Sequence, residues 1–81
     1  GLSALHAAVE GGHEDVVRLL IQHGADVNPT TEPQKQTPLH YAARKGNSVI
    51  AHILLRRGAD PNAHSSDGIT PLEFAVHFGH R

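Results

Sequence analysis

An internal repeat of 33 to 34 residues constrains the fold of this chain more than any other feature of its sequence. Residues 24–26 (Gly-Ala-Asp) recur at residues 58–60, a shift of 34 positions. Residues 37–39 (Thr-Pro-Leu) recur at residues 70–72, a shift of 33 positions. A unit of this length cannot bury its apolar face alone, so successive units must stack on one another to form a continuous core.

Each unit predicts two short helices. Thr37 and Thr70 supply N-cap hydroxyl groups, and the proline after each is suited to the first helical position. Gly46 is expected to end a helix, because glycine adopts the left-handed conformation at little cost. Apolar residues at helical spacing predict helices near residues 3–11, 14–23, 37–45, 48–57 and 70–78. Leu20 and Leu54, on the inner face of the second helices, are expected in the core between units.

The connection between the first two units, here called the first loop (residues 29–36), is one residue longer than the second loop (residues 63–69). Surface connections tolerate such insertions at little cost. Lys35 stands where the second loop has glycine, and Pro29 and Pro33 precede it. We therefore expect the first loop to project from the surface without forming the standard hairpin turn.

These motifs resemble the ankyrin repeat. Residues 37–46 (TPLHYAARKG) and residues 53–63 (ILLRRGADPNA) are close to the family pattern, and the resemblance covers essentially the whole chain. It implies an all-α solenoid of helix-turn-helix units with connecting hairpin loops. It also implies protein recognition on a concave surface formed by the loops and the first helices. His6 and His40 occupy the position whose side chain, in this family, hydrogen-bonds neighbouring backbone.

The whole chain forms a single ankyrin-like segment, which the repeat divides into about two and a half units. We expect the first unit at residues 1–34, the second at 35–67 and a partial third at 68–81. Glu73 departs from the pattern, since it replaces the repeated histidine in the third unit. The chain is expected to begin within a hairpin and to be an excerpt of a longer array.

Composition argues against several classes of function. The formal net charge of −1 is unlike that of a general nucleic-acid binder or of a polybasic membrane anchor. No apolar run approaches the roughly 18 residues that span a bilayer, and no signal peptide opens the chain. The chain has no cysteine, which fits a reducing compartment. We therefore expect an intracellular protein, cytoplasmic or nuclear.

Eight histidines invite a metal-site hypothesis, but their spacing does not favour one. His13 and Glu14 begin like a zincin motif, yet Val17 stands where the second histidine is required. The sequence also lacks a nucleophile elbow, a phosphate-binding loop and a plausible pair of catalytic carboxylates. We expect no metal, no cofactor and no enzymatic activity.

The resemblance implies a scaffold or adaptor that binds a partner protein on its concave face. The alternative is a structural or regulatory segment of a larger enzyme or channel whose active part is absent. Partner contacts are expected at loop tips and at the ends of first helices, where residues differ between units. This predicted strip consists of Glu10, Gln34, Gln36, Arg44, Lys45, Ile69, His77 and Phe78.

Two further groups of residues have a structural interpretation beside the functional one. Arg56 and Arg57 lie in the last turn of a predicted helix, where cations stabilise the negative end of the helix dipole, so we expect them to be mostly structural. The resemblance also implies that Asn28 or Asn62 is a site of asparagine hydroxylation. A turn-stabilising hydrogen bond is the expected main role of both asparagines.

Overall fold

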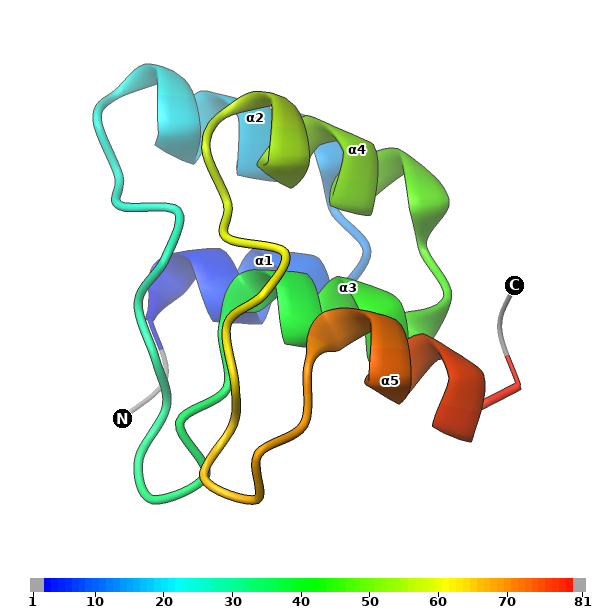
Figure 1. Ribbon diagram of the computed structural model, residues 1–81. Coiled ribbons are helices and arrows are strands. Elements are labelled where there is room, and N and C mark those ends of the chain that lie inside the picture. The colour runs from blue at the N-terminus through cyan, green and yellow to red at the C-terminus, as the bar shows by residue number, and fades with distance from the viewer. Residues whose placement is uncertain (1–2, 80–81) are drawn as a thin grey trace.

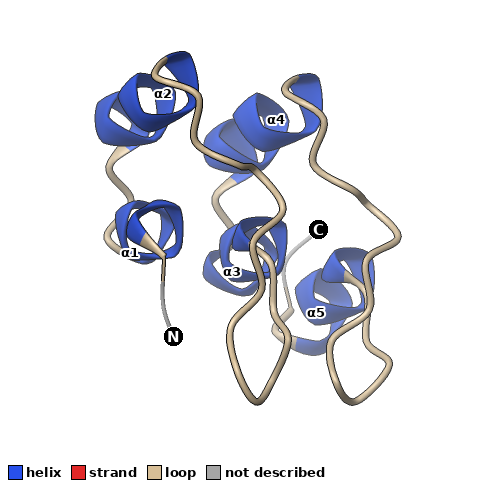
Figure 2. Cartoon of the chain, turned by 90° about the vertical axis from the view of Figure 1, so that its left-hand side faces the viewer, coloured by secondary structure: helices blue, strands red, loops and turns tan. Residues whose placement is uncertain are grey.

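The computed structural model describes residues 3–79 and is all-α in that range (Figure 1). Its helices are α1 (Ala4–Glu10), α2 (Glu14–Gln22), α3 (Pro38–Lys45), α4 (Ser48–Arg56) and α5 (Pro71–His77). Helices α1, α3 and α5 form one layer, and α2 and α4 lie over them as a second layer (Figure 2). The expected helix-turn-helix solenoid is confirmed, and every predicted helix end agrees with the structure to within one residue.

The first helices begin at caps that the sequence predicts. The Oγ1 atom of Thr37 accepts a hydrogen bond from the His40 backbone N–H at 3.3 Å, and the His40 side chain accepts one from the Thr37 backbone N–H at 3.0 Å. Thr70 and Glu73 form the same reciprocal box at the start of α5. Gly46 ends α3 in the left-handed conformation, with φ of +69°. Such caps stabilise helices that are too short to form alone.

The apolar core lies between the two layers and between successive units. Ile50 and Leu54 of α4 are completely buried, as is Val17 of α2. Leu20, which the sequence places in the core with Leu54, packs against the core but is only half-buried, so that prediction is confirmed for Leu54 and only in part for Leu20. The reason is positional: α2 packs against α4 on one side, and within residues 3–79 no helix covers its other side.

The first loop is closed by two backbone hydrogen bonds. The Thr31 N–H donates to the Gln36 carbonyl at 3.0 Å, and the Lys35 N–H donates to the Thr31 carbonyl at 2.7 Å. Ser65 makes the equivalent pair of bonds in the second loop. Lys35 adopts φ of +55°, close to the +76° of Gly68 in the second loop. The bond from Lys35 to Thr31 spans four residues, against three for the bond from Gly68 to Ser65. The turn therefore departs from that of the second loop, as expected, although both loops close with the same pair of bonds.

Both loops extend in the same direction from the layer of α1, α3 and α5 (Figure 1). The Ser66 N–H donates to the Gln34 carbonyl at 2.8 Å and joins the two loops. The two loops therefore form one continuous surface beside the first helices. No helix within residues 3–79 is both long enough and apolar enough to cross a bilayer.

Candidate partner-binding surface

Two buried histidines, one in α1 and one in α3, each connect a first helix to the loop at the end of its unit. The Nε2 atom of His40 lies 2.7 Å from the Ile69 carbonyl oxygen, and that of His6 lies 2.7 Å from the Gln36 carbonyl oxygen. A carbonyl oxygen only accepts, so Nε2 of each ring carries the proton. The backbone role expected for both histidines is confirmed. These bonds fix the backbone positions of Gln36 and Ile69, two residues of the predicted strip.

An aromatic ring from the next unit packs on each of these histidines. The Tyr41 ring meets the His6 ring edge-on, with 4.9 Å between centroids, and Phe74 meets His40 in the same way at 5.0 Å. Tyr41 and Phe74 are 33 positions apart and therefore occupy equivalent places in two units. Edge-to-face contact suits aromatic quadrupoles. The 33-residue shift aligns this pair in the sequence, but the predicted strip contains neither residue.

Burial lowers the pKa of His6 and of His40 below the ordinary histidine value, and this outweighs the opposite effect of the bonds to Gln36 and Ile69. Charge repulsion from His64 and from His6 lowers the pKa of His40 further. A protonated ring would also lose Nδ1 as the acceptor for the cap hydroxyl and backbone N–H. Both histidines are therefore neutral in the folded chain near pH 7.

The free energy of unfolding should fall as the pH drops below about 6.5. The unfolded chain binds protons at His6 and His40 near that pH, whereas the folded chain binds them only at lower pH, so acid favours unfolding. Urea unfolding at pH 7.5, 6.5 and 5.5 measures this loss. A His40→Gln variant should retain only about half of it, because His6 alone remains. A stability independent of pH over this range would contradict the neutral, buried state.

A cluster of ionised side chains joins the ends of α1 and α3. Arg44 forms an ion pair with Glu10, and the Lys45 Nζ lies 3.4 Å from the other carboxylate oxygen of Glu10. The Arg44 guanidinium also lies 4.6 Å from the centroid of the Tyr41 ring, which is cation–π geometry. Glu10 and Arg44 are 34 positions apart, so opposite charges meet at equivalent places in adjacent units. This cluster carries a net charge of +1 (one anion and two cations).

An aromatic hollow of about 390 Å³ opens on α5. Phe78 is 47 % exposed, and its ring centroid lies 6.0 Å from that of Phe74 and 4.9 Å from that of His77. Hydrogen bonds from Thr70 lower the pKa of the exposed Glu73 carboxyl, which therefore stays ionised beside these rings. The residues that line the hollow are Ile69, Glu73, Phe74, His77 and Phe78.

The eight residues of the predicted strip thus fall into three groups. The ionised cluster contains Glu10, Arg44 and Lys45, and the aromatic hollow contains Ile69, His77 and Phe78. The other two belong to the first loop, where Gln34 is exposed and Gln36 is half-buried. Glu73 and Phe74 lie in the same hollow but are not part of the predicted strip.

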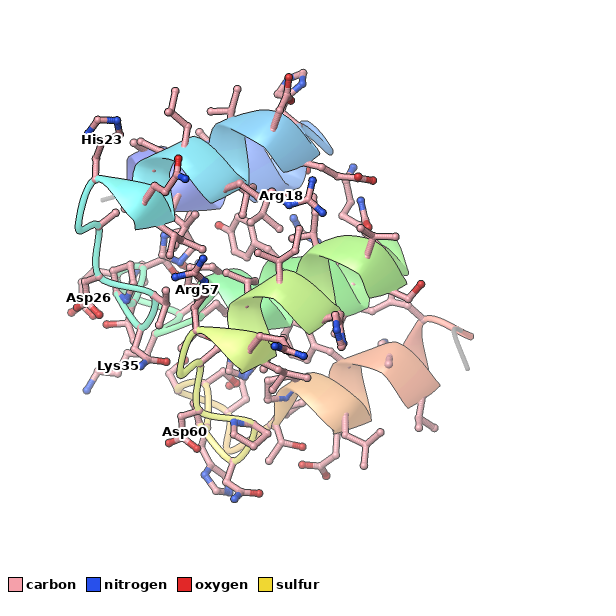
Figure 3. All side chains as sticks on the ribbon, turned by 90° about the horizontal axis from the view of Figure 1, so that it is seen from above. Arg18, His23, Asp26, Lys35, Arg57 and Asp60 are labelled. Atoms are coloured by element: carbon pink, nitrogen blue, oxygen red, sulfur yellow. The ribbon has the colours of Figure 1, made fainter. Side chains whose placement is uncertain are left out.

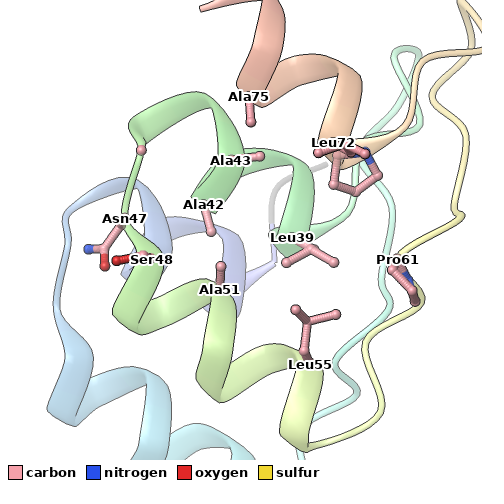
Figure 4. Close-up of a pocket in the computed structure, with 12 residues that line it drawn as sticks. Leu39, Ala42, Ala43, Asn47, Ser48, Ala51, Leu55, Pro61, Leu72 and Ala75 are labelled. Atoms are coloured by element: carbon pink, nitrogen blue, oxygen red, sulfur yellow. The ribbon is translucent and has the colours of Figure 1, made fainter. Parts of the chain in front are cut away.

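A second, apolar groove lies beside α4 and α5 (Figure 4). Leu39 and Ala51 lie in its floor, and Leu55 and Leu72 line it, with Leu72 73 % exposed. Ala51 is 34 positions after Val17, a residue of α2 that is completely buried. The groove therefore includes a position whose equivalent in the first unit belongs to the core. Among residues 3–79, no three His, Asp or Glu side chains come together as metal ligands would.

Comparison with known proteins agrees with this geometry. The family model described as "Ankyrin repeats (3 copies)" matches residues 1–65 and 32–81. Alpha-latrotoxin-Lh1a of Latrodectus hasselti is 37 % identical over 82 residues, which cover 100 % of this chain and 6 % of the toxin. The BTB/POZ domain and ankyrin repeat-containing protein NPR5 of Oryza sativa subsp. japonica is 45 % identical over 71 residues, 86 % of this chain and 14 % of that protein. The NF-kappa-B inhibitor cactus of Drosophila melanogaster is 44 % identical over 39 residues, 48 % of this chain and 8 % of the inhibitor.

Proposed function

Because the chain belongs to the ankyrin-repeat family, whose members are generally protein–protein interaction modules, we propose that it binds a partner protein through the predicted strip. The observation that carries this proposal is the aromatic hollow on α5. Phe78 is half-exposed there: its backbone N–H caps the C-terminus of α5, but its side chain lies outside the buried core. Exposed aromatic residues in a hollow are typical centres of binding energy at protein interfaces.

The chemistry of the hollow indicates which partner group would fit it. The rings of Phe74 and Phe78 offer an apolar surface, and the ionised Glu73 carboxylate lies at its border. An apolar side chain next to a lysine or arginine of the partner would complement both features. The Glu10 cluster, with its net charge of +1, would add orientation and a faster encounter with an acidic region of the same partner.

Phe78→Ala should weaken partner binding by at least about tenfold, the effect of losing a central aromatic contact. The partner is first isolated by pull-down with the chain, and affinities are then measured by calorimetry. Leu72→Ala is the matched control, since Leu72 is an exposed apolar residue on the same helix but outside the strip. It should change the affinity by less than about twofold.

The contribution of Arg44 and Lys45 to binding is best tested by replacing them with uncharged residues. Reversing the charge of Arg44 and Lys45 would place acids beside Glu10 and would destabilise the fold as well as binding. Arg44→Gln combined with Lys45→Gln avoids this repulsion and should slow association, an effect that shrinks at high salt. If the affinity survives both this change and Phe78→Ala, the partner binds elsewhere on the chain.

A structural or regulatory role inside a larger protein is the second candidate function. The chain corresponds to 6 % of the latrotoxin and 14 % of NPR5, so an ankyrin segment of this kind also occurs within much longer proteins. Under this alternative the strip would contact another part of the same protein. A full-length protein from which residues 1–81 are deleted would then change its own activity without losing an external partner. We further propose an intracellular location, which fractionation with compartment markers would test.

Asparagine hydroxylation also remains a proposal. The side-chain amide of Asn28 donates to the Gly58 carbonyl at 3.1 Å and accepts from the Asp60 N–H at 2.9 Å, so it bridges two units. A modifying enzyme would have to displace this bridge to reach Asn28. Asn62 therefore becomes the more accessible of the two candidates. Peptide mass spectrometry of the protein from its native cell would reveal the added oxygen, and its absence at both asparagines would contradict the proposal.

A further inference from the structure

The outer face of the molecule, opposite the loops, carries a cationic groove between α2 and α4. Arg18 of α2 and three residues of α4 and its C-terminal cap, His52, Arg56 and Arg57, line a hollow of about 460 Å³. Seen from this side, Arg18 and Arg57 both lie over the line where α2 and α4 meet (Figure 3). We call this feature the outer groove.

The cations of the outer groove lack the neutralisation that those of the strip have. Arg44 and Lys45 share the Glu10 carboxylate, whereas within residues 3–79 none of Arg18, Arg56 and Arg57 forms an ion pair. The chain as a whole has a formal net charge of −1, so this concentration of positive charge is local. Like charges gathered without a counter-charge oppose folding, and an anion bound from outside would relieve that repulsion.

Helix chemistry accounts for only part of the cluster. Arg56 and Arg57 end α4, where cations stabilise the helix dipole. Arg18 is in the middle of α2 and His52 is in the middle of α4, where the dipole gives no such benefit. These two residues are 34 positions apart, so the repeat brings them to equivalent places on neighbouring helices. The helix end therefore explains Arg56 and Arg57, whereas the stacking of the two units brings Arg18 and His52 together.

The lining of the groove defines the ligand. Guanidinium groups bind carboxylates with paired, charge-assisted hydrogen bonds. Ile21 and Ile53, both half-buried, add an apolar floor between the cations. We propose that the outer groove binds an acidic segment of a protein, in which carboxylates flank an apolar side chain. This surface is formed by a different helix layer from the strip, so both can be occupied at once.

The test uses a fluorescein-labelled peptide with four glutamates around a central leucine, and a second peptide with glutamines in their place. Fluorescence anisotropy should give at least about tenfold tighter binding of the acidic peptide to the 81-residue chain. Arg18→Gln should weaken that binding by at least about fivefold. Lys35→Gln removes the same charge from an exposed residue of the first loop and should weaken it by less than about twofold.

Further measurements distinguish specific peptide binding from unfolding, from general charge attraction and from nucleic-acid binding. Circular dichroism at the assay temperature checks that each variant keeps the parent helix content, and Arg18→Lys should restore part of the lost affinity. Equal weakening by Arg18→Gln and Lys35→Gln would overturn the proposal in favour of general charge attraction. Tighter binding of a single-stranded DNA of equal charge would overturn it in favour of a nucleic acid. Phe78→Ala should leave the peptide affinity unchanged. The test of the outer groove is therefore independent of the proposal that the strip binds a partner.

Discussion

Replacing Leu54 with alanine should lower the free energy of unfolding by about 2–5 kcal/mol, from lost burial and the cavity left behind. Leu54 lies in α4 with none of its surface exposed, at the centre of the core between the two units. Small domains are stable by only about 5–15 kcal/mol, so this single change should remove a large part of the total.

Leu55→Ala is the matched control for this experiment. Leu55 is the next residue of the same helix, and its side chain is 45 % exposed, so its truncation should cost less than about 1 kcal/mol. Urea unfolding followed by circular dichroism compares the two variants with the parent chain. Equal midpoints for Leu54→Ala and the parent would show that α4 does not face the core as described.

The second large effect is expected for His40→Ala, which should lower the free energy of unfolding by about 2–4 kcal/mol. The buried imidazole holds the Ile69 carbonyl at 2.7 Å, accepts the Thr37 N–H and packs against Phe74. Alanine leaves the Ile69 carbonyl without this donor and opens a space beside the Phe74 ring. The variant should therefore loosen the second loop as well as the start of α3.

His23→Ala provides the control, since His23 is exposed and points away from the helices (Figure 3). Its truncation should change the unfolding free energy by less than about 0.5 kcal/mol. Hydrogen exchange adds a local measurement, because the Ile69 amide donates to Ser65 inside the second loop. If His40→Ala and His23→Ala unfold at the same urea concentration, the bridge from His40 to the second loop contributes nothing to stability.

The helices were predictable because each depends on local chemistry. Thr37, Thr70 and Gly46 mark helix ends through cap hydroxyls and a left-handed backbone, and these signals act within a few residues. The core was less predictable, because burial depends on which neighbours are present. Leu20 and Leu54 are equivalent in sequence, yet Leu54 is completely buried, whereas Leu20 packs at the edge of the core and is only half-buried.

The first loop shows a different limit. Lysine in place of glycine, with two prolines nearby, suggested a departure from the hairpin turn. The turn is one residue longer than that of the second loop, as expected, but Lys35 adopts a positive φ and Thr31 makes the closing hydrogen bonds that Ser65 makes in the second loop. The residue preference for this conformation is a matter of modest energy, which the surrounding bonds outweigh.

The surface features could be predicted only in part. The strip residues are marked in the sequence by their variation between units, but their grouping depends on contacts between units. Comparing equivalent positions would have revealed the opposite charges of Glu10 and Arg44, and the shared aromatic character of Tyr41 and Phe74. The hollow around Phe78 also needs the packing of α5 on α3, which no single-residue pattern specifies.

Site-specific photo-crosslinking to the isolated partner tests the central claim, that the strip is the protein-binding surface, most directly. A photoreactive amino acid replaces Gln34, an exposed strip residue of the first loop, or Gln22, a glutamine in the outer groove. We expect irradiation to couple the partner through position 34, and Phe78→Ala in the same chain to reduce the yield. Coupling through position 22 with none through position 34 would contradict the claim.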